Sequence, residues 1–136
     1  MVGRQLRDFV RERANNQCEY CRLPQTLEPF LAFHVDHIVA EQHGGDDNPM
    51  NLCWCCQYCN LKKGPNLSGR DDITGRAVGL FNPRTDTWSE HFEWNGPFLV
   101  SNTPTGRATI HCLAINHPDN VAQRQAFIAE GVFPLQ

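Results

Sequence analysis

The chain has 136 residues and a formal net charge of −3, with 12 Lys and Arg against 15 Asp and Glu. This length suits one domain with a modest hydrophobic core, and no apolar run is long enough to span a membrane. The acidic balance argues against tight, passive DNA binding, because Lys and Arg must replace the counterions around phosphates. The same charge balance is compatible with a small enzyme that contacts few phosphates and binds its own metal cation.

The cysteine content indicates metal binding. The first residues, MVGRQLRDFVRER, carry charges throughout and lack the apolar stretch of a secretory signal, so we expect a cytoplasmic protein. In that reducing compartment, seven cysteines, most of them in two short clusters, favour zinc binding over a disulfide framework.

The first predicted element is an amphipathic helix over residues 4–15, with apolar side chains on one face and arginines on another. These arginines form either a solvated face or a face that contacts phosphates. Cys18 and Cys21 follow as a Cys-x-x-Cys pair. On a tight turn such a pair directs two thiolates at one point, as half of a zinc site requires.

A strand, a loop, a second strand and a helix are predicted next. Residues 32–39 alternate as a strand does, residues 41–49 hold the Gly-Gly and Asp-Asp-Asn steps of a loop, and residues 51–54 form the returning strand. The helix is predicted over residues 56–63, and a Gly-Pro step ends it.

The second half of the zinc site has two possible registers, Cys53/Cys56 and Cys56/Cys59. We favour Cys56/Cys59, because a knuckle that leads into a helix is a common zinc arrangement. Together with Cys18 and Cys21, this register gives a closed site of four thiolates, which is structural rather than catalytic. Cys53 is then expected to pack within its strand.

The remainder of the chain is predicted to form short strands and a final helix. The four predicted strands are residues 77–81, 88–94, 98–101 and 108–115. Cys112, in the last of them, is expected to be a buried thiol. The final helix is predicted over residues 118–130, with Asn116 or His117 as its N-cap and a proline at its first position.

Asp36, His37 and Asn60 imply a second metal site of a different character. Carboxylate and amide oxygens suit Mg²⁺ or Mn²⁺. Hydrolysis of a phosphodiester requires an activated water and neutralisation of charge at the leaving oxygen. A histidine base beside one bound cation can supply both.

The succession of these motifs resembles the HNH endonuclease family. Residues 18–64 contain Cys-x-x-Cys, Asp-His-Ile, Gly-Gly, Asn-Leu and Cys-x-x-Cys-Asn-x-x-Lys-Gly in this order. The resemblance implies an α+β protein with a ββα-metal core and a structural zinc, preceded by a helix and followed by short strands and a helix. It also implies a single nuclease domain over residues 1–136, in which residues 65–136 form a C-terminal extension.

The resemblance further implies roles for individual residues. His37 would be the general base that deprotonates water, Asp36 a metal ligand, and Asn51 the residue that holds the loop and orients His37 through backbone hydrogen bonds. Asn60 stands where the family's last motif histidine is usually found, so the motif reads His-Asn-Asn. As a ligand it should favour Mg²⁺ or Mn²⁺ over softer metals. Lys63 matches the family's trailing lysine and is expected to contact DNA.

The expected activity is therefore hydrolysis of DNA phosphodiester bonds by a metal-dependent endonuclease. One site would nick DNA, and double-strand cleavage would require a homodimer or two encounters by a monomer. His34 lies on the same strand face as Asp36, so it is either an outer metal ligand or a polar strand residue. The alternative function is a zinc-stabilised module without catalysis that binds nucleic acid or protein, which the acidic balance and Asn60 would suit.

Overall fold

The computed structural model describes residues 2–135, which form two compact units. Unit 1 contains the residues up to Leu67 together with Asn82–Thr85, and unit 2 contains Ser68–Phe81 and the residues from Asp86 onward. No helix within residues 2–135 is long and apolar enough to cross a membrane. The single domain expected over residues 1–136 stays a prediction, because compactness alone does not show whether a unit folds independently.

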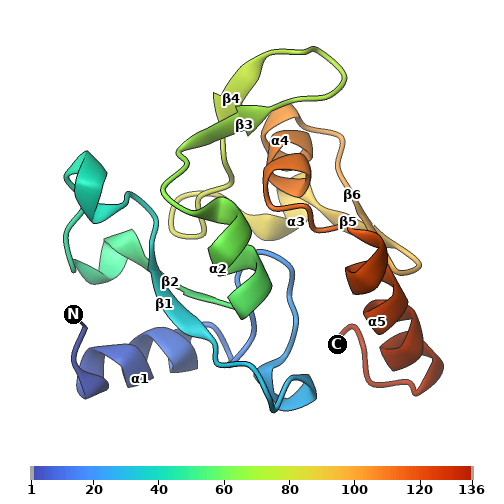
Figure 1. Ribbon diagram of the computed structural model, residues 1–136, viewed down its shortest axis with the longest axis horizontal. Helices are drawn as coiled ribbons and strands as arrows, with labels where there is room; N and C mark the ends of the chain where they lie inside the picture. The colour runs from blue at the N-terminus through green and yellow to red at the C-terminus, as the bar shows by residue number, and fades with distance from the viewer. Residues whose placement is uncertain (1, 136) are drawn as a thin grey trace. The chain divides into compact units, whose positions relative to one another are not determined.

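Unit 1 contains the ββα core, as predicted (Figure 1). Its helices and strands are α1 (Arg4–Arg13), β1 (His34–His37), β2 (Leu52–Cys55) and α2 (Gln57–Lys63), with 3-10 turns η1 (Gln25–Leu27), η2 (Glu41–His43) and η3 (Pro49–Asn51). β1 and β2 pair antiparallel with Asp36 opposite Cys53, and α1 packs against this hairpin.

β2 is buried along its whole length, although it belongs to a two-stranded sheet. A strand covered on both faces has a continuous apolar sequence, and Leu-Cys-Trp-Cys fits that pattern. α1 covers Trp54: the guanidinium of Arg7 lies 4.8 Å from the indole ring centre. Arg13 donates hydrogen bonds to the carbonyl oxygens of Pro49 (3.0 Å) and Leu52 (2.7 Å). Two of the helix arginines therefore hold the hairpin in place.

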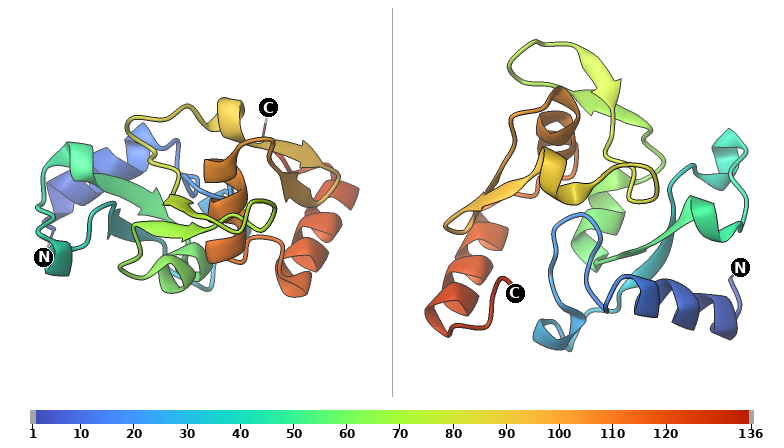
Figure 2. Two further views of the ribbon diagram at one scale, coloured as in Figure 1. Left: turned by 90° about the horizontal axis from the view of Figure 1, so that it is seen from above. Right: turned by 180° about the vertical axis from the view of Figure 1, so that it is seen from behind.

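Unit 2 is built from two hairpins and three helices. Its elements are β3 (Ser68–Arg70), β4 (Ala77–Gly79), α3 (Trp88–His91), β5 (Glu93–Asn95), β6 (Phe98–Val100), α4 (Pro104–Cys112) and α5 (Pro118–Ala129). α4 lies beside the β3–β4 hairpin (Figure 2). Gly69 permits this close approach, because a Cβ there would stand 3.0 Å from both the Ala108 carbonyl oxygen and the Cys112 Cβ.

The strand predicted over residues 108–115 is wrong, because these residues belong largely to helix α4 and the turn after it. The Thr103 hydroxyl accepts a hydrogen bond from the Gly106 amide (3.0 Å), and a proline follows the cap, which together start a helix. Gly106, Thr109 and Leu113 are buried at a helical spacing of three and four residues. The Thr-Pro-Thr-Gly sequence is thus a helix start and not only a turn. Cys112 lies in this helix and is partly exposed.

The prediction for residues 88–94 is partly wrong, because this segment divides into the short helix α3 and strand β5. The strands predicted over residues 77–81 and 98–101 correspond to β4 and β6, whereas the buried position expected for Cys112 is wrong, because Cys112 is partly exposed. Gly96, with a positive φ of 59°, turns β5 into β6. α5 begins as predicted, and the His117 Nδ1 accepts a hydrogen bond from the Asp119 amide (3.1 Å).

Candidate active site and metal centre

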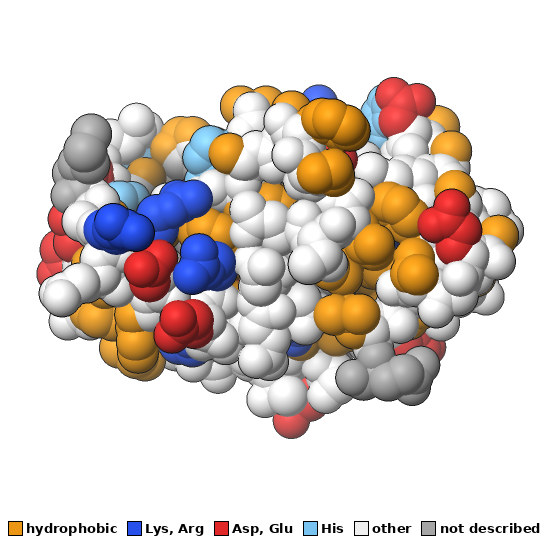
Figure 3. Space-filling view, turned by 90° about the horizontal axis from the view of Figure 1, so that it is seen from below, with side chains coloured by type: hydrophobic (Ala, Val, Ile, Leu, Met, Phe, Trp, Pro, Cys, Tyr) orange, Lys and Arg blue, Asp and Glu red, His pale blue; other side chains and the backbone are white. Residues whose placement is uncertain are grey.

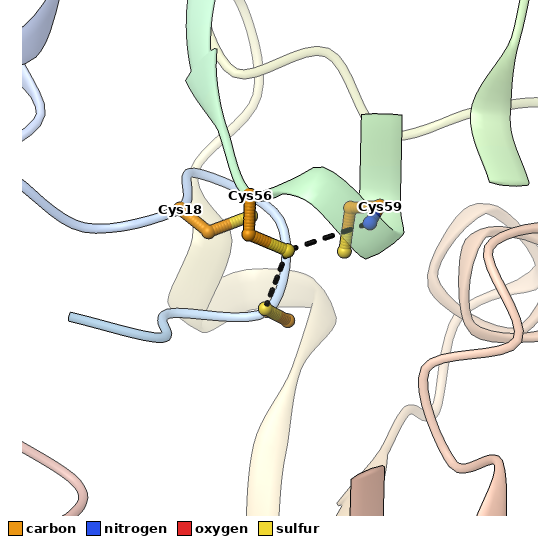
Figure 4. A group of neighbouring side chains, drawn as sticks. Cys18, Cys56 and Cys59 are labelled. Carbon is orange, nitrogen blue, oxygen red and sulfur yellow. Dashed lines mark hydrogen bonds between the residues drawn. The ribbon is translucent and has the colours of Figure 1, made fainter. Parts of the chain in front are cut away.

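Four buried cysteine sulfurs form a compact cluster in unit 1 (Figure 4). The sulfurs of Cys18, Cys21, Cys56 and Cys59 lie within 4.8 Å of one another. The Cys21 and Cys56 sulfurs are 3.7 Å apart. Four thiolates bound to zinc at about 2.3 Å in tetrahedral geometry stand roughly 3.8 Å from one another. The number, kind and spacing of these ligands therefore fit a zinc ion.

Two local structures bring the sulfurs together. The Cys18 amide donates to the Leu23 carbonyl (2.9 Å), and the Arg22 amide donates to the Cys18 carbonyl (2.9 Å), which closes the turn that carries the first pair. Cys56 is the N-cap of α2, and its sulfur accepts a hydrogen bond from the Cys59 amide (3.4 Å). The structure thus groups the Cys56/Cys59 register with the first pair.

Cys53, the competitor for the second register, points elsewhere. Its sulfur donates weakly to the Tyr20 hydroxyl (3.7 Å) and to Asp36 Oδ2 (3.9 Å). The Cys53 sulfur is therefore directed away from the cluster formed by the other four cysteines. The expected strand packing of Cys53 agrees with this environment.

Glu19, between the first two cysteines, is a buried residue whose contacts the sequence pattern does not predict. One carboxylate oxygen accepts a hydrogen bond from the Trp54 amide (2.8 Å), and the other forms an ion pair with Arg84. Burial raises the pKa of Glu19. Glu19 therefore links the zinc turn to β2 and to residues 82–85 of the same unit. No spacing in the sequence signals this pairing, because 65 positions separate its partners.

Asp36, His37 and Asn60, the three residues predicted to carry the chemistry, line one cavity of about 320 Å³. β1 contributes Asp36 and His37, and the first turn of α2 contributes Asn60. Glu41 also lines the cavity. The cavity thus offers a carboxylate, an imidazole and an amide, a donor set that fits a hard cation such as Mg²⁺ or Mn²⁺.

Lys63 lies in surroundings that differ from the predicted surface position. Its side chain is only 2% exposed, its ammonium lies 3.5 Å from Asp36 Oδ2, and it donates to the carbonyl oxygens of His37 and Ile38 (both 3.3 Å). Burial raises the pKa of Asp36, and the ammonium of Lys63 opposes that shift. Lys63 therefore balances the charge of the proposed metal ligand and would have to leave this pair to reach a DNA phosphate.

Asn51 holds the loop between β1 and β2. Its side chain accepts a hydrogen bond from the Val39 amide (2.9 Å) and donates to the carbonyl oxygens of Val39 (3.0 Å) and Asp46 (2.8 Å). Its main-chain carbonyl accepts a hydrogen bond from the Ile38 amide (2.8 Å). These contacts fix the residues that follow His37, which is the kind of bracing that the resemblance implies.

The imidazole of His37 has one close polar contact among residues 2–135. Its Nε2 lies 2.7 Å from Asp47 Oδ1 and 3.7 Å from Glu41 Oε1. The hydrogen bond from His37 lowers the pKa of Asp47, which keeps that carboxylate ionised. The sequence predicts Asp47 only as part of a polar loop, and its spacing does not indicate that the Asp47 side chain reaches His37.

His34 contacts α2 and does not line the cavity. Its Nε2 forms a hydrogen bond with Gln57 Oε1, at the first residue of that helix. This contact favours the interpretation of His34 as a polar strand residue over that of an outer metal ligand.

The charged side chains near α1 are mixed in sign. Arg11 forms an ion pair with Asp8 at 3.5 Å. On the face shown in Figure 3, Lys and Arg side chains are interspersed with Asp and Glu side chains. This mixture agrees with a solvated helix face.

Comparisons with known proteins support the motif assignment. The family model described as HNH endonuclease matches residues 18–66. The Septu protein PtuB of Bacillus thuringiensis is 28% identical over 119 residues, which cover 86% of this chain and 43% of PtuB. The chain thus spans less than half the length of this curated relative. No solved structure matches the chain significantly.

Proposed function

Because the HNH endonuclease model matches residues 18–66, we propose that this chain is a metal-dependent endonuclease that hydrolyses DNA phosphodiester bonds. The observation that carries the proposal is the convergence of Asp36, His37 and Asn60 on one cavity of unit 1. A general base and two oxygen donors within one cavity are the groups that hydrolysis of a phosphodiester requires.

The roles follow from the chemistry of each group. His37 takes a proton from the attacking water, and Asn51 holds the backbone beyond it. Asp36 and Asn60 would hold one Mg²⁺ or Mn²⁺. When bound, such a cation neutralises charge on the scissile phosphate and on the leaving oxygen. The Lys63 ammonium, 3.5 Å from Asp36 Oδ2, favours the ionised carboxylate, which is the form that a cation requires.

The four cysteines would hold a zinc ion with a structural role. Four thiolates fill a tetrahedral site and leave no position for water or substrate. The zinc would join the turn at Cys18 and Cys21 to the start of α2, which carries Asn60. The zinc site therefore supports the cavity without taking part in the reaction.

Relaxation of supercoiled plasmid DNA in the presence of Mg²⁺ or Mn²⁺ tests the proposal. The wild type should convert supercoiled plasmid to the nicked form, since one site cuts one strand. Replacement of the base in His37→Ala should lower the rate by at least about 100-fold. His43→Ala is the matched control, because His43 is an exposed histidine of the same loop.

The proposal fails if the wild type and His37→Ala leave the plasmid equally intact across a series of divalent metals. In that case the second candidate remains, a zinc-stabilised module that binds nucleic acid or protein without cutting. Its support is the net charge of −3 and the asparagine at position 60. It predicts binding that Asp36→Ala leaves unchanged. Purified protein would decide between a monomer and a homodimer by its mass in solution.

A further inference from the structure

The contact between Asp47 and His37 adds a residue to the proposed machinery. We propose that Asp47 is a positioning residue that fixes the tautomer of His37, so that Nδ1 is the nitrogen that takes the proton from water. This inference rests on the proposed function, because it requires His37 to be the general base. It names an additional residue and the reacting atom of that base.

The geometry of the contact determines where the imidazole proton lies. An ionised carboxylate only accepts hydrogen bonds, and the 2.7 Å distance between His37 Nε2 and Asp47 Oδ1 is that of a charge-assisted bond. The proton therefore lies on Nε2. A neutral imidazole with a proton on Nε2 has its lone pair on Nδ1. Within residues 2–135, His37 Nδ1 has no hydrogen-bond partner, so this lone pair is available.

The same distance is that of an ordinary hydrogen bond. The ligand atoms of His37, Glu41 and Asp47 lie close enough together to suggest a metal site. One shared proton accounts for the 2.7 Å contact between His37 and Asp47 without a cation. Glu41 Oε1, at 3.7 Å, is too distant for a hydrogen bond to Nε2.

The main chain on both sides of Asp47 is fixed, which holds its carboxylate in place. The Asp46 carbonyl accepts a hydrogen bond from the Asn51 side chain (2.8 Å). The Asn48 amide donates to Asp46 Oδ1 (3.1 Å), and the Asn48 carbonyl accepts a hydrogen bond from the Asn51 amide (2.7 Å). A short side chain on a fixed backbone loses little entropy when it binds the imidazole. Asn51 thus supports His37 both directly along the chain and through Asp47.

The proton transfers balance through the ring. A water proton moves to His37 Nδ1, the resulting hydroxide forms a bond to phosphorus, and the bond from phosphorus to the leaving oxygen breaks. The leaving oxygen takes a proton from solvent, and Nδ1 later returns its proton to solvent. The proton on Nε2 stays in place throughout. Asp47 stabilises the imidazolium that forms during the step, as a carboxylate does when it orients a histidine base.

The wild-type protein provides a direct test without mutation. Nitrogen-15 NMR of the histidine side chains in the zinc-loaded full chain, in mildly alkaline buffer, distinguishes the two neutral tautomers. We expect His37 to carry its proton on Nε2, with a downfield, slowly exchanging signal that is lost in Asp47→Ala. A His37 that carries its proton on Nδ1 in the wild type would overturn the inference.

Kinetics on supercoiled plasmid with Mg²⁺ or Mn²⁺ provide the second test. Asp47→Ala should lower kcat by about 10- to 100-fold with little change in KM, and Asp47→Glu should recover part of the loss. Asp119→Ala is the matched control, because it removes an exposed carboxylate 3.7 Å from a different histidine, His117. Equal kcat in wild type and Asp47→Ala overturns this inference alone. A wild type that does not cleave overturns the proposed function as well.

Discussion

Gly45, in the loop between β1 and β2, lies against the backbone of Val39 and leaves no room for a side chain. A Cβ at this position would stand 1.6 Å from the Val39 carbonyl oxygen and 2.9 Å from Asn51 Nδ2. Even alanine therefore cannot fit unless the backbone moves. Both atoms belong to the contacts by which Asn51 braces the residues after His37, so the second glycine of the Gly-Gly step is required by packing.

Gly45→Ala should therefore lower both stability and cleavage. We expect a loss of about 1–3 kcal/mol in the free energy of unfolding, the range for a group forced into a packed region. Cleavage should fall by at least about 10-fold, because the backbone beyond His37 shifts. Urea unfolding and plasmid relaxation measure the two effects. Gly79→Ala is the control, since a Cβ there meets nothing within 4 Å. A Gly45→Ala protein as stable and active as this control would contradict the argument.

At this scale the sequence predicts residues that belong to a motif and misses those that only the folded loop brings together. Asp36, His37 and Asn60 could be proposed because they stand at the positions of the HNH motif that the sequence resembles, and the structure brings all three to one cavity. Asp47 could not be identified in this way. It lies ten residues from His37 in the sequence, and only the folded loop brings the two side chains together. Lys63 was identified by position, but its burial beside Asp36 depends on packing that spacing does not encode.

The junction of β2 and α2 carries both the second cysteine pair and Asn60, a proposed metal ligand. Cys56 directly precedes α2 and is its N-cap. Asn60 follows one helical turn later in the same helix. The hairpin and helix could be predicted because alternation, a Gly-Gly loop and a Gly-Pro stop all agree. α4 could not, because its Thr-Ile-His-Cys sequence has strand propensity and only the Thr103 cap reveals a helix.

Cysteine replacements at this junction should separate the two registers. Cys56→Ser should abolish or strongly weaken zinc binding, because it removes one of four thiolates. Cys53→Ser should retain one zinc per chain, because the Cys53 sulfur faces Tyr20 and Asp36. Native mass spectrometry counts the bound zinc in each protein. Zinc retained in Cys56→Ser but lost in Cys53→Ser would show that the other register binds the metal.

At the scale of the whole molecule, the chain leaves unit 1 after Leu67 and contributes residues 82–85 to it again. These four residues carry Arg84, which pairs with the buried Glu19 of the zinc turn. A fragment that stops at the end of the HNH match would therefore lack a buried partner of the zinc turn. The HNH motif could be predicted from the sequence. The pairing of Glu19 with Arg84 could not, because a single arginine outside any motif gives no indication of its partner.

Arg84→Ala should destabilise unit 1 by about 3–5 kcal/mol at neutral pH, because it leaves an unpaired carboxylate in a buried position. Burial already raises the pKa of Glu19 above its ordinary value of 4.5, and removal of Arg84 raises it further. A carboxyl group with a raised pKa in the folded state favours folding while it is protonated, and this contribution is lost as pH rises through that pKa. The deficit of Arg84→Ala relative to the wild type should therefore be small near pH 4.5 and grow towards pH 8.

Urea unfolding of both proteins at several pH values measures this difference, with Arg76→Ala as the control for loss of an exposed arginine. Arg76→Ala should remain within about 0.5 kcal/mol of the wild type at every pH, as surface substitutions usually do. Glu19→Gln combined with Arg84→Ala should show no such rise in the deficit with pH, because no carboxylate is left to ionise. A deficit in Arg84→Ala that is the same at both ends of the pH range would mean that packing of the arginine stem, and not its charge, stabilises the zinc turn.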